Sequence, residues 1–436
     1  MNKMVRSCAI ALGLAFVAGS ASAVPHKFDW NQVNGGDMSA STNWVDQGES
    51  SKLSEDTYRI VKTQSGDLTL GSDFAVPRFD FGYSTLKVEG TMNLGADKTL
   101  SCDKFYVIKG SAGRLTSGTI CFTNSIRIGE VSGGESDMYT SFVLDGPDAK
   151  FVSADGKVAA IGSTTGANNH FEVRNGAQFI APLSIGRVGG SDIATGNYFL
   201  ASGEGTLVNV SADNTSIGAL SWDENSMTAD NHLTLTDGAK MIAKNVKIGD
   251  ADAKNGGSNN VFTVANGATL EMAGGVLHVS PNGHPGNMLV VSNATLDATN
   301  FEIYHPASYT NATICLAGTN TFCYFHSRKQ TFPSTQKLIL DVTGPNAQSM
   351  MAQAPQFTFE EGSKLVITSS KDLSDVDDFE VVTLATFSAP LDPIPEGVLE
   401  IDPNCGLEVD MTTDPTKLIV RHKKAEKKTG TCIFIR

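Results

Sequence analysis

A nine-residue unit that recurs about every thirty residues limits the possible folds of this 436-residue chain more than any other feature. The clear copies are NHFEVRNGA from Asn169, NYFLASGEG from Asn197, NHLTLTDGA from Asn231, NVFTVANGA from Asn260 and NMLVVSNAT from Asn287. A weaker copy, TSFVLDGPD, begins at Thr140. Successive asparagines are 28, 34, 29 and 27 residues apart. A period of roughly 20 to 50 residues predicts a solenoid, in which each repeat stacks on the one before it.

Within each copy, apolar residues alternate with small or polar residues, as in the segment 261–265, which predicts a strand with one buried face. An Asn-Gly or Asp-Gly pair then bends the chain, because glycine adopts a positive φ at little cost. Two more alternating stretches follow, and the last ends at an Ile-Gly pair such as Ile248-Gly249. We therefore expect an all-β chain folded as a right-handed parallel β-helix, with three short strands per coil. Equivalent residues of successive coils would lie about 4.8 Å apart.

The asparagine that opens each clear copy is predicted to lie at the same corner of successive coils. There its amide would bond to the next asparagine and to backbone at the bend, forming a structural ladder. The ladder residues are Asn169, Asn197, Asn231, Asn260 and Asn287. The alternative, a polar stripe that binds a ligand, requires these amides to face solvent. His170 and His232 follow two of the asparagines, but Tyr198, Val261 and Met288 occupy the same position elsewhere, so we expect no metal ligand there.

Polar loops of variable length connect each Ile-Gly pair to the next copy. Such insertions fall on one edge of a solenoid, which is often the binding edge. We single out Trp222, Asp223 and Glu224 as a candidate ligand loop, in which the indole either stacks on a sugar ring or covers the edge. Asp250 and Asp252, or Asp223 and Glu224, are candidate Ca²⁺ ligands, but the ordered series of oxygen ligands of a calcium loop is missing, so we interpret these loops as solvated.

The repeat pattern weakens toward both ends of the chain, as expected for a solenoid whose end coils must be capped. The expected boundaries are a signal peptide at 1–23, an N-terminal cap at 24–80, repeats at 81–350, C-terminal cap strands at 351–422 and a basic tail at 423–436. The tail either contacts an anionic surface or is a solvated chain end.

The first 23 residues have the features of a secretory signal peptide. A short basic segment precedes an apolar run at 9–18, and Ala21-Ser22-Ala23 supplies the small residues of a cleavage site. We therefore expect a secreted or cell-surface protein. No later stretch reaches the roughly 20 apolar residues that a membrane helix needs. Loss of the signal changes the formal charge from −14 to −16, and such an acidic chain is a poor partner for nucleic acid.

Six cysteines remain after removal of the signal, and an even number in an oxidising compartment suggests disulfides. They are Cys102, Cys121, Cys315, Cys323, Cys405 and Cys432. Their grouping suggests that sequence neighbours pair, although six cysteines allow 15 connectivities. The alternative is a mixture of a few disulfides and buried free thiols.

The stretch WNQVNGGDMSASTNW, from Trp30 to Trp44, together with the NGA turns, resembles secreted bacterial β-helical proteins of the autotransporter-passenger type. FEVVTLATF and KLIVRH are similar to the strands that end such passengers. Met38 departs from the pattern, because that family usually has tryptophan there. The resemblance implies an extracellular β-helix and names no ligand. We expect passenger-like repeats without a translocator barrel, because the chain ends at KKAEKKTGTCIFIR.

Two classes of function remain after these observations. The first is a non-enzymatic, adhesin-like or structural envelope or matrix protein, with a polysaccharide or another cell-surface component as partner. The second is a carbohydrate-active β-helix enzyme, a polysaccharide lyase or glycoside hydrolase, which needs acid and base groups on one outward face. Glu172 and Arg174 become Thr234 and Thr236 in a later copy, so we expect no catalytic residues, cofactor or metal and favour the first class. The sequence does not fix the oligomeric state.

Overall fold

The computed structural model describes residues 24–30, 32–49, 55–82, 88–108, 110–130, 139–162, 166–187, 193–218, 227–250, 257–281, 283–301, 312–318, 320–325, 330–344, 357–386 and 392–423. Over these residues the ordered elements are strands, apart from one 3₁₀ turn at Ser41–Asn43. No helix in this part of the chain is long and apolar enough to span a bilayer. The predicted signal peptide and residues 424–436 of the tail lie outside the described residues.

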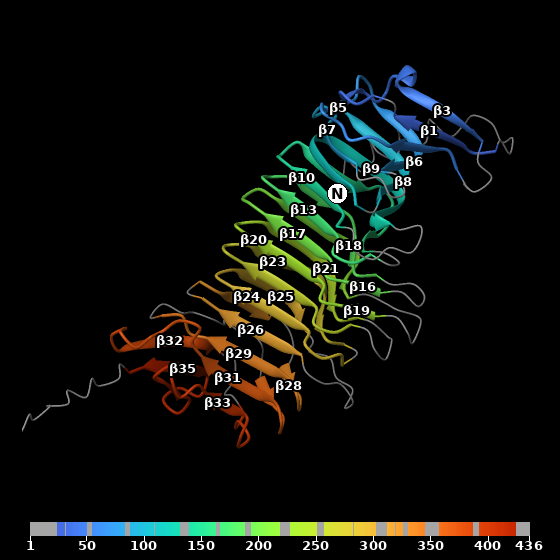
Figure 1. Cartoon of the computed structure of the whole chain (residues 1–436). Coiled ribbons are helices and arrows are strands. Elements are labelled where there is room, and N and C mark those ends of the chain that lie inside the picture. Colours follow the sequence, from blue (N-terminus) through green and yellow to red (C-terminus); the bar gives the residue numbers. More distant parts are fainter. Residues whose placement is uncertain are drawn as a thin grey trace, which may run out of the picture.

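The recurring unit forms one strand of each coil, and these strands pair in parallel, in sequence order. They are β10 (Ser141–Asp145), β13 (His170–Arg174), β17 (Tyr198–Ser202), β20 (His232–Thr236), β22 (Val261–Ala265), β24 (Met288–Ser292), β26 (Thr313–Ala317), β29 (Lys337–Asp341) and β31 (Lys364–Thr368). The register places Phe171 between Phe142 and Phe199. Figure 1 shows the strands stacked along one axis. The predicted parallel β-solenoid is confirmed.

Among the described residues, the coils from β9 (Ala112–Glu130) to β23 (Thr269–Val279) contain three strand segments, as predicted. The long β9 shows this best, because its successive parts pair with β10, β11 (Ala149–Ser153) and β12 (Ala159–Ile161). The second and third segments of the following coils are β14 (Gln178–Ile180), β15 (Leu183–Ile185), β18 (Leu207–Ile217), β21 (Lys240–Ile248), β23 (Thr269–Val279), β25 (Thr295–Phe301) and β27 (Phe322–Phe325). Two short strands, β16 (Ile193–Thr195) and β19 (Met227–Ala229), pair in parallel on the loop edge.

The inward positions of the coils form one continuous apolar core. Along β13, the side chains alternate between buried and partly exposed, which follows from the two-residue period of a strand. The ring of Phe171 stacks between those of Phe142 and Phe199, with centroid distances of 6.0 and 5.6 Å. No single coil could bury these rings alone, so the stability of one coil depends on its neighbours.

Parallel pairing extends beyond the expected repeat range of 81–350. Near the N-terminus, β1 (His26–Trp30) pairs in parallel with β4 (Thr57–Ile60), which pairs with β6 (Phe74–Phe81). Toward the C-terminus, β31 pairs in parallel with β33 (Leu399–Ile401). Strands that pair in antiparallel lie at both ends. They are β3 (Trp44–Glu49), which pairs with β1, and the sheet of β32 (Phe379–Thr386), β34 (Leu407–Asp410) and β35 (Lys417–His422).

The segment that carries the passenger resemblance folds into the first coil. Trp30 and Met38 are fully buried, and Trp44 packs edge-on against Trp30 at a centroid distance of 5.2 Å. The indole of Trp44 donates a hydrogen bond to the backbone oxygen of Met38, 2.8 Å away. The indole of Trp30 donates to Gln64 Oε1 at 3.1 Å. Met38 therefore fills a core position of the first coil.

The expectation that neighbouring cysteines pair is wrong for the described residues, because Cys102, Cys315, Cys323 and Cys405 are free. Strand register explains why Cys102 and Cys121 do not pair. Cys121 lies opposite Ser101 rather than Cys102, so Cys102 and Cys121 face opposite sides of the sheet. Cys432 lies outside the described residues.

Cys315 and Cys323 are separated by their positions within the coil. Cys315 is on the partly exposed face of β26, whereas Cys323 belongs to the core and lies on β27, in the other sheet of the coil. Burial raises the pKa of the Cys323 thiol, and it raises the pKa of Cys315 to about 11. Both thiols are therefore protonated and poorly reactive near neutral pH.

Peptide mapping of the non-reduced protein is expected to show neither a Cys102–Cys121 nor a Cys315–Cys323 link. A thiol reagent should label Cys102 and Cys323 only after the chain is unfolded, because both are fully buried. Cys315, which is only partly buried, provides the internal comparison. Detection of either link in the native protein would contradict the register described above.

Candidate functional site

The five predicted asparagines form a ladder of buried hydrogen bonds at one corner of the coils. Each side-chain amide donates to Oδ1 of the next asparagine, at distances of 2.8, 2.9, 3.0 and 3.1 Å. The same Oδ1 also accepts the backbone N–H of the preceding asparagine. The last amide, of Asn287, donates to the backbone oxygen of His284 at 2.9 Å. All five are at most 1% exposed, so the ladder does not present a ligand stripe to solvent.

The glycine of each Ile-Gly pair leaves room for the side chain of a ladder asparagine. A Cβ on the glycine of the pair would lie between 2.1 and 2.4 Å from an asparagine side chain, far inside van der Waals contact. The glycines are Gly129, Gly162, Gly186, Gly218 and Gly249. The residue before each ladder asparagine has a positive φ, which we did not predict from the sequence. These residues are Asn168, Gly196, Asp230, Asn259 and Gly286.

The candidate ligand loop of Trp222, Asp223 and Glu224 lies outside the described residues, as does Asp252. Asp250 is described, and it accepts a hydrogen bond from the Lys247 ammonium at 3.1 Å. Within the described ranges, no group of three His, Cys, Asp or Glu side chains is arranged to hold a metal ion.

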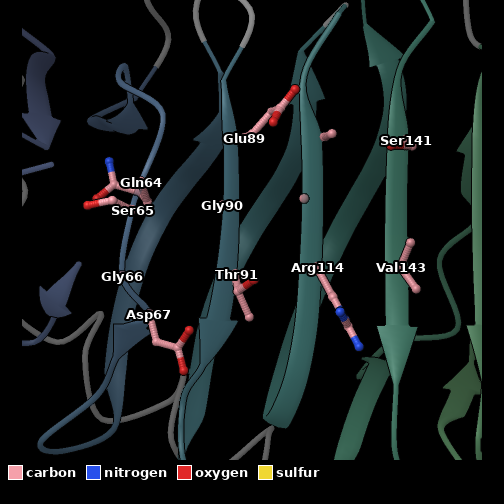
Figure 2. Close-up of a pocket in the computed structure, with 12 residues that line it drawn as sticks. Gln64, Ser65, Gly66, Asp67, Glu89, Gly90, Thr91, Arg114, Ser141 and Val143 are labelled. Carbon is pink, nitrogen blue, oxygen red and sulfur yellow. The ribbon is translucent and has the colours of Figure 1, made fainter. Parts of the chain in front are cut away.

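A polar groove lies on the outer face of the first coils, between the segment 64–67, which precedes β5 (Leu68–Thr69), and the strands β7 (Glu89–Asn93), β9 and β10 (Figure 2). It has a volume of about 370 Å³. Its lining consists of Gln64, Ser65, Gly66, Asp67, Glu89, Gly90, Thr91, Ala112, Gly113, Arg114, Ser141 and Val143. We call this site the outer-face groove.

Small side chains on the outer face make the groove hollow. Ala112 and Ser141 lie opposite each other on adjacent strands, where longer side chains would fill the space. Two residues further along, Thr91, Arg114 and Val143 form a row on three neighbouring strands, which Figure 2 shows. The groove therefore has two small side chains, Ala112 and Ser141, beside a row that carries the Arg114 cation.

A network of ion pairs continues from the groove onto the next coil. The Arg114 guanidinium contacts the Asp145 carboxylate, which also accepts a hydrogen bond from Arg174 Nε at 3.1 Å. Arg174 Nη1 in turn lies 3.1 Å from Glu172 Oε2. Burial alone would raise the pKa of Asp145, but hydrogen bonds from Asn175 and Arg174 and the charges of both guanidinium groups hold that pKa below its usual range. Asp145 is therefore an anion that fixes both arginines.

A column of rings borders the groove beyond Ser141. The rings belong to Tyr139, His170, Tyr198 and His232, and successive centroids are 6.0, 4.9 and 6.3 Å apart. Tyr139 OH lies 2.6 Å from His170 Nδ1, and His170 Nε2 lies 3.3 Å from Glu172 Oε1. Burial lowers the pKa of His170, although the Glu172 charge opposes this, so the imidazole is neutral near pH 7.

Comparison of the later copies alone does not reveal this cluster. In the copy at Asn231, threonines replace Glu172 and Arg174, and Asp145, the partner of Arg174, comes from the earlier and weaker copy at Thr140. The signal was the copy at Thr140, which has Asp145 where the next copy has Arg174. Opposite charges at one position of adjacent coils predict an ion pair across the strands.

The fold and this face define the chain as a parallel β-solenoid with a polar groove and an adjoining ion-pair and ring cluster on one outer sheet. Comparisons with protein-family profiles, with curated proteins and with solved structures find no match.

Proposed function

We propose that this is an exported β-solenoid that binds a polysaccharide or a similar hydroxyl-rich component of a cell surface, in an adhesin-like or structural role. The outer-face groove is the observation that carries the proposal. Its walls present carboxylates, hydroxyls and a guanidinium, which are groups that form hydrogen bonds with sugar hydroxyls. The leader at 1–23 and the passenger-like segment support export. The right-handed turn of the coils and the role of the end strands as caps belong to the same proposal.

The charges in the groove favour a ligand with many hydroxyl groups over a strongly charged polymer. Glu89 and Asp67 are exposed on one side, and Arg114 stands on the other with its side chain 47% exposed. Arg114 shares Asp145 with Arg174, and a guanidinium has five donors, so several remain for a ligand. Such a mixed surface provides both acceptors and donors along an extended chain.

Substitution of Ser141 by tryptophan is expected to abolish binding, because the indole fills the space left by the two small side chains. The measurement is the dissociation constant for immobilised polysaccharides, neutral and acidic. Val261→Trp is the matched control, since Val261 occupies the same position four coils further along, outside the groove. It should bind within about 2-fold of the original chain, because surface changes away from a site have small effects. Equal binding by both variants would place the ligand elsewhere.

The second candidate function is a carbohydrate-active solenoid enzyme. The specific observation that favours it is the hydrogen-bonded contact between Tyr139 and His170 at the edge of the groove. The two candidates differ in turnover, because the first binds a polysaccharide without changing it.

A further inference from the structure

The outward face of the repeat strands becomes apolar toward the C-terminal end of the solenoid. In β24, β26, β29 and β31 the first and third residues are partly exposed, and the residue between them is buried. The third residues form one straight row, because these strands pair without a shift of register, and Figure 1 shows the strands next to one another. The row consists of Val290, Cys315, Ile339 and Val366, and we call it the outer apolar stripe.

The same row is mostly polar on either side of the stripe. In the preceding coils it consists of Glu172, Leu200, Thr234 and Thr263. After the stripe it ends at the exposed Glu400, which pairs with Lys364 at 2.6 Å. Apolar patches that continue over several elements and have a polar rim mark interaction surfaces. The stripe is therefore a candidate contact surface.

Lys337 and Asp341 lie on opposite sides of Ile339 on β29, and neither has an ion-pair partner among the described residues. Asp341 Oδ1 accepts the backbone N–H of Ser370 at 2.7 Å, and its second oxygen has no hydrogen bond within the described part of the chain. Burial raises the pKa of Cys315, the Asp341 charge adds to this rise and the Lys337 charge opposes it. Both charges therefore lie near the stripe.

This arrangement is complementary to itself. A rotation of 180° about an axis along the stripe brings a second copy face to face, with Ile339 against the partner's Ile339. Lys337 then lies opposite the partner's Asp341, and Asp341 lies opposite the partner's Lys337. A two-fold interface pairs one surface with itself, so it needs opposite charges at equal distances on the two sides of the axis. Lys337 and Asp341 meet this condition, because each is two residues from Ile339.

We propose that the outer apolar stripe is the contact between two parallel copies of this chain. Packed sheets lie about 10 Å apart, a gap that one long lysine side chain largely crosses. The four coils and five residue positions of the patch measure about 19 by 17 Å. That area is below the roughly 800 Å² per partner of a stable interface, so the dimer is reversible and depends on concentration. The inference goes beyond the proposed function.

The contact is separate from the outer-face groove. Ser141, which lines the groove, lies seven coils before Lys337 in the parallel register. Aligned sheets cross at about 30°, so the two solenoids diverge from the stripe toward the groove. Dimer formation and polysaccharide binding can therefore be measured independently.

Sedimentation equilibrium of the full chain, from low micromolar to millimolar concentration, tests the contact. A monomer–dimer equilibrium is expected. Ile339→Asp should weaken it at least about 10-fold, because two like charges then meet on the axis. Leu200→Asp is the matched control, since Leu200 is a partly exposed apolar residue of the same row, three coils before Val290. It should leave the dimerisation constant within about 2-fold.

A charge reversal tests the orientation of the two copies. Lys337→Glu should weaken the dimer, because the partner's Asp341 then faces a carboxylate. Addition of Asp341→Lys to Lys337→Glu restores opposite charges and should recover most of the lost affinity. Such a recovery does not arise from damage to the fold, and far-ultraviolet circular dichroism confirms that each variant is folded.

Three results would overturn the inference. The first is a chain that stays monomeric at every concentration. The second is a dimer that Ile339→Asp leaves intact, and the third is a double variant that associates no better than Lys337→Glu alone. These measurements use no polysaccharide, so their failure would leave the proposed function untouched.

Discussion

Substitution of Asn231 by alanine is expected to lower the free energy of unfolding by about 4 kcal/mol, since each buried polar group left without a partner costs about 1–3 kcal/mol. Asn231 Oδ1 accepts the backbone N–H and the side-chain amide of Asn197, at 3.1 and 2.9 Å. Its own amide donates to Asn260 Oδ1 at 3.0 Å and to Thr228 Oγ1 at 3.1 Å. Alanine removes all of these bonds and leaves their partners buried, where water does not replace the lost contacts.

Asn214→Ala is the matched control, because Asn214 is an exposed asparagine whose side chain also accepts a hydrogen bond from an asparagine of the next coil. Solvent replaces that bond, so the change should stay within about 0.5 kcal/mol. Urea denaturation followed by circular dichroism gives both values. A loss below about 1 kcal/mol for Asn231→Ala would mean that the ladder contributes little to stability.

Substitution of Phe171 by alanine should lower the free energy of unfolding by about 3–5 kcal/mol, the usual cost of removing a large ring from a core. The ring has four aromatic neighbours, with centroids 5.5 to 6.0 Å away. The strands on either side are held in a continuous parallel register, so the cavity cannot collapse by a shift of one strand alone.

Phe171→Leu is the graded comparison and should cost less, because leucine fills part of the cavity. The same urea titration measures it, together with the outward change Glu172→Gln on the same strand, which creates no cavity. Equal losses for alanine and leucine would show that ring packing, rather than cavity volume, controls stability at this position.

The solenoid could be predicted because its determinants repeat along the sequence. A strand with one buried face, an Asn-Gly turn and an asparagine at fixed spacing each occur often enough to be recognised in one chain. The paired Ile-Gly landmark was visible, but its cause was not, because the glycine makes room for an asparagine side chain of another coil. Which residues of different coils touch depends on the register of strand pairing, and this register cannot be derived from a single sequence.

The candidate site could not be predicted for the opposite reason, because its residues do not repeat. Arg114 and Asp145 lie in coils whose sequences match the repeat pattern only weakly, and Tyr139 precedes the repeat unit. Their chemistry arises only when three coils stack. The cysteines show the same limitation, since proximity in sequence does not determine which side of a sheet a sulfur faces.

In the asparagine ladder every hydrogen bond between coils is donated toward the C-terminal end of the solenoid. The two ends of the ladder are therefore not equivalent. Each amide finds its acceptor in the coil that follows, so a fragment that stops between Asn197 and Asn287 leaves its final amide without that acceptor. Asn287 differs, because it closes the series on His284 of its own coil. Proteolysis from the carboxyl end should therefore pause at Asn287, because the last amide of the ladder still has its acceptor there.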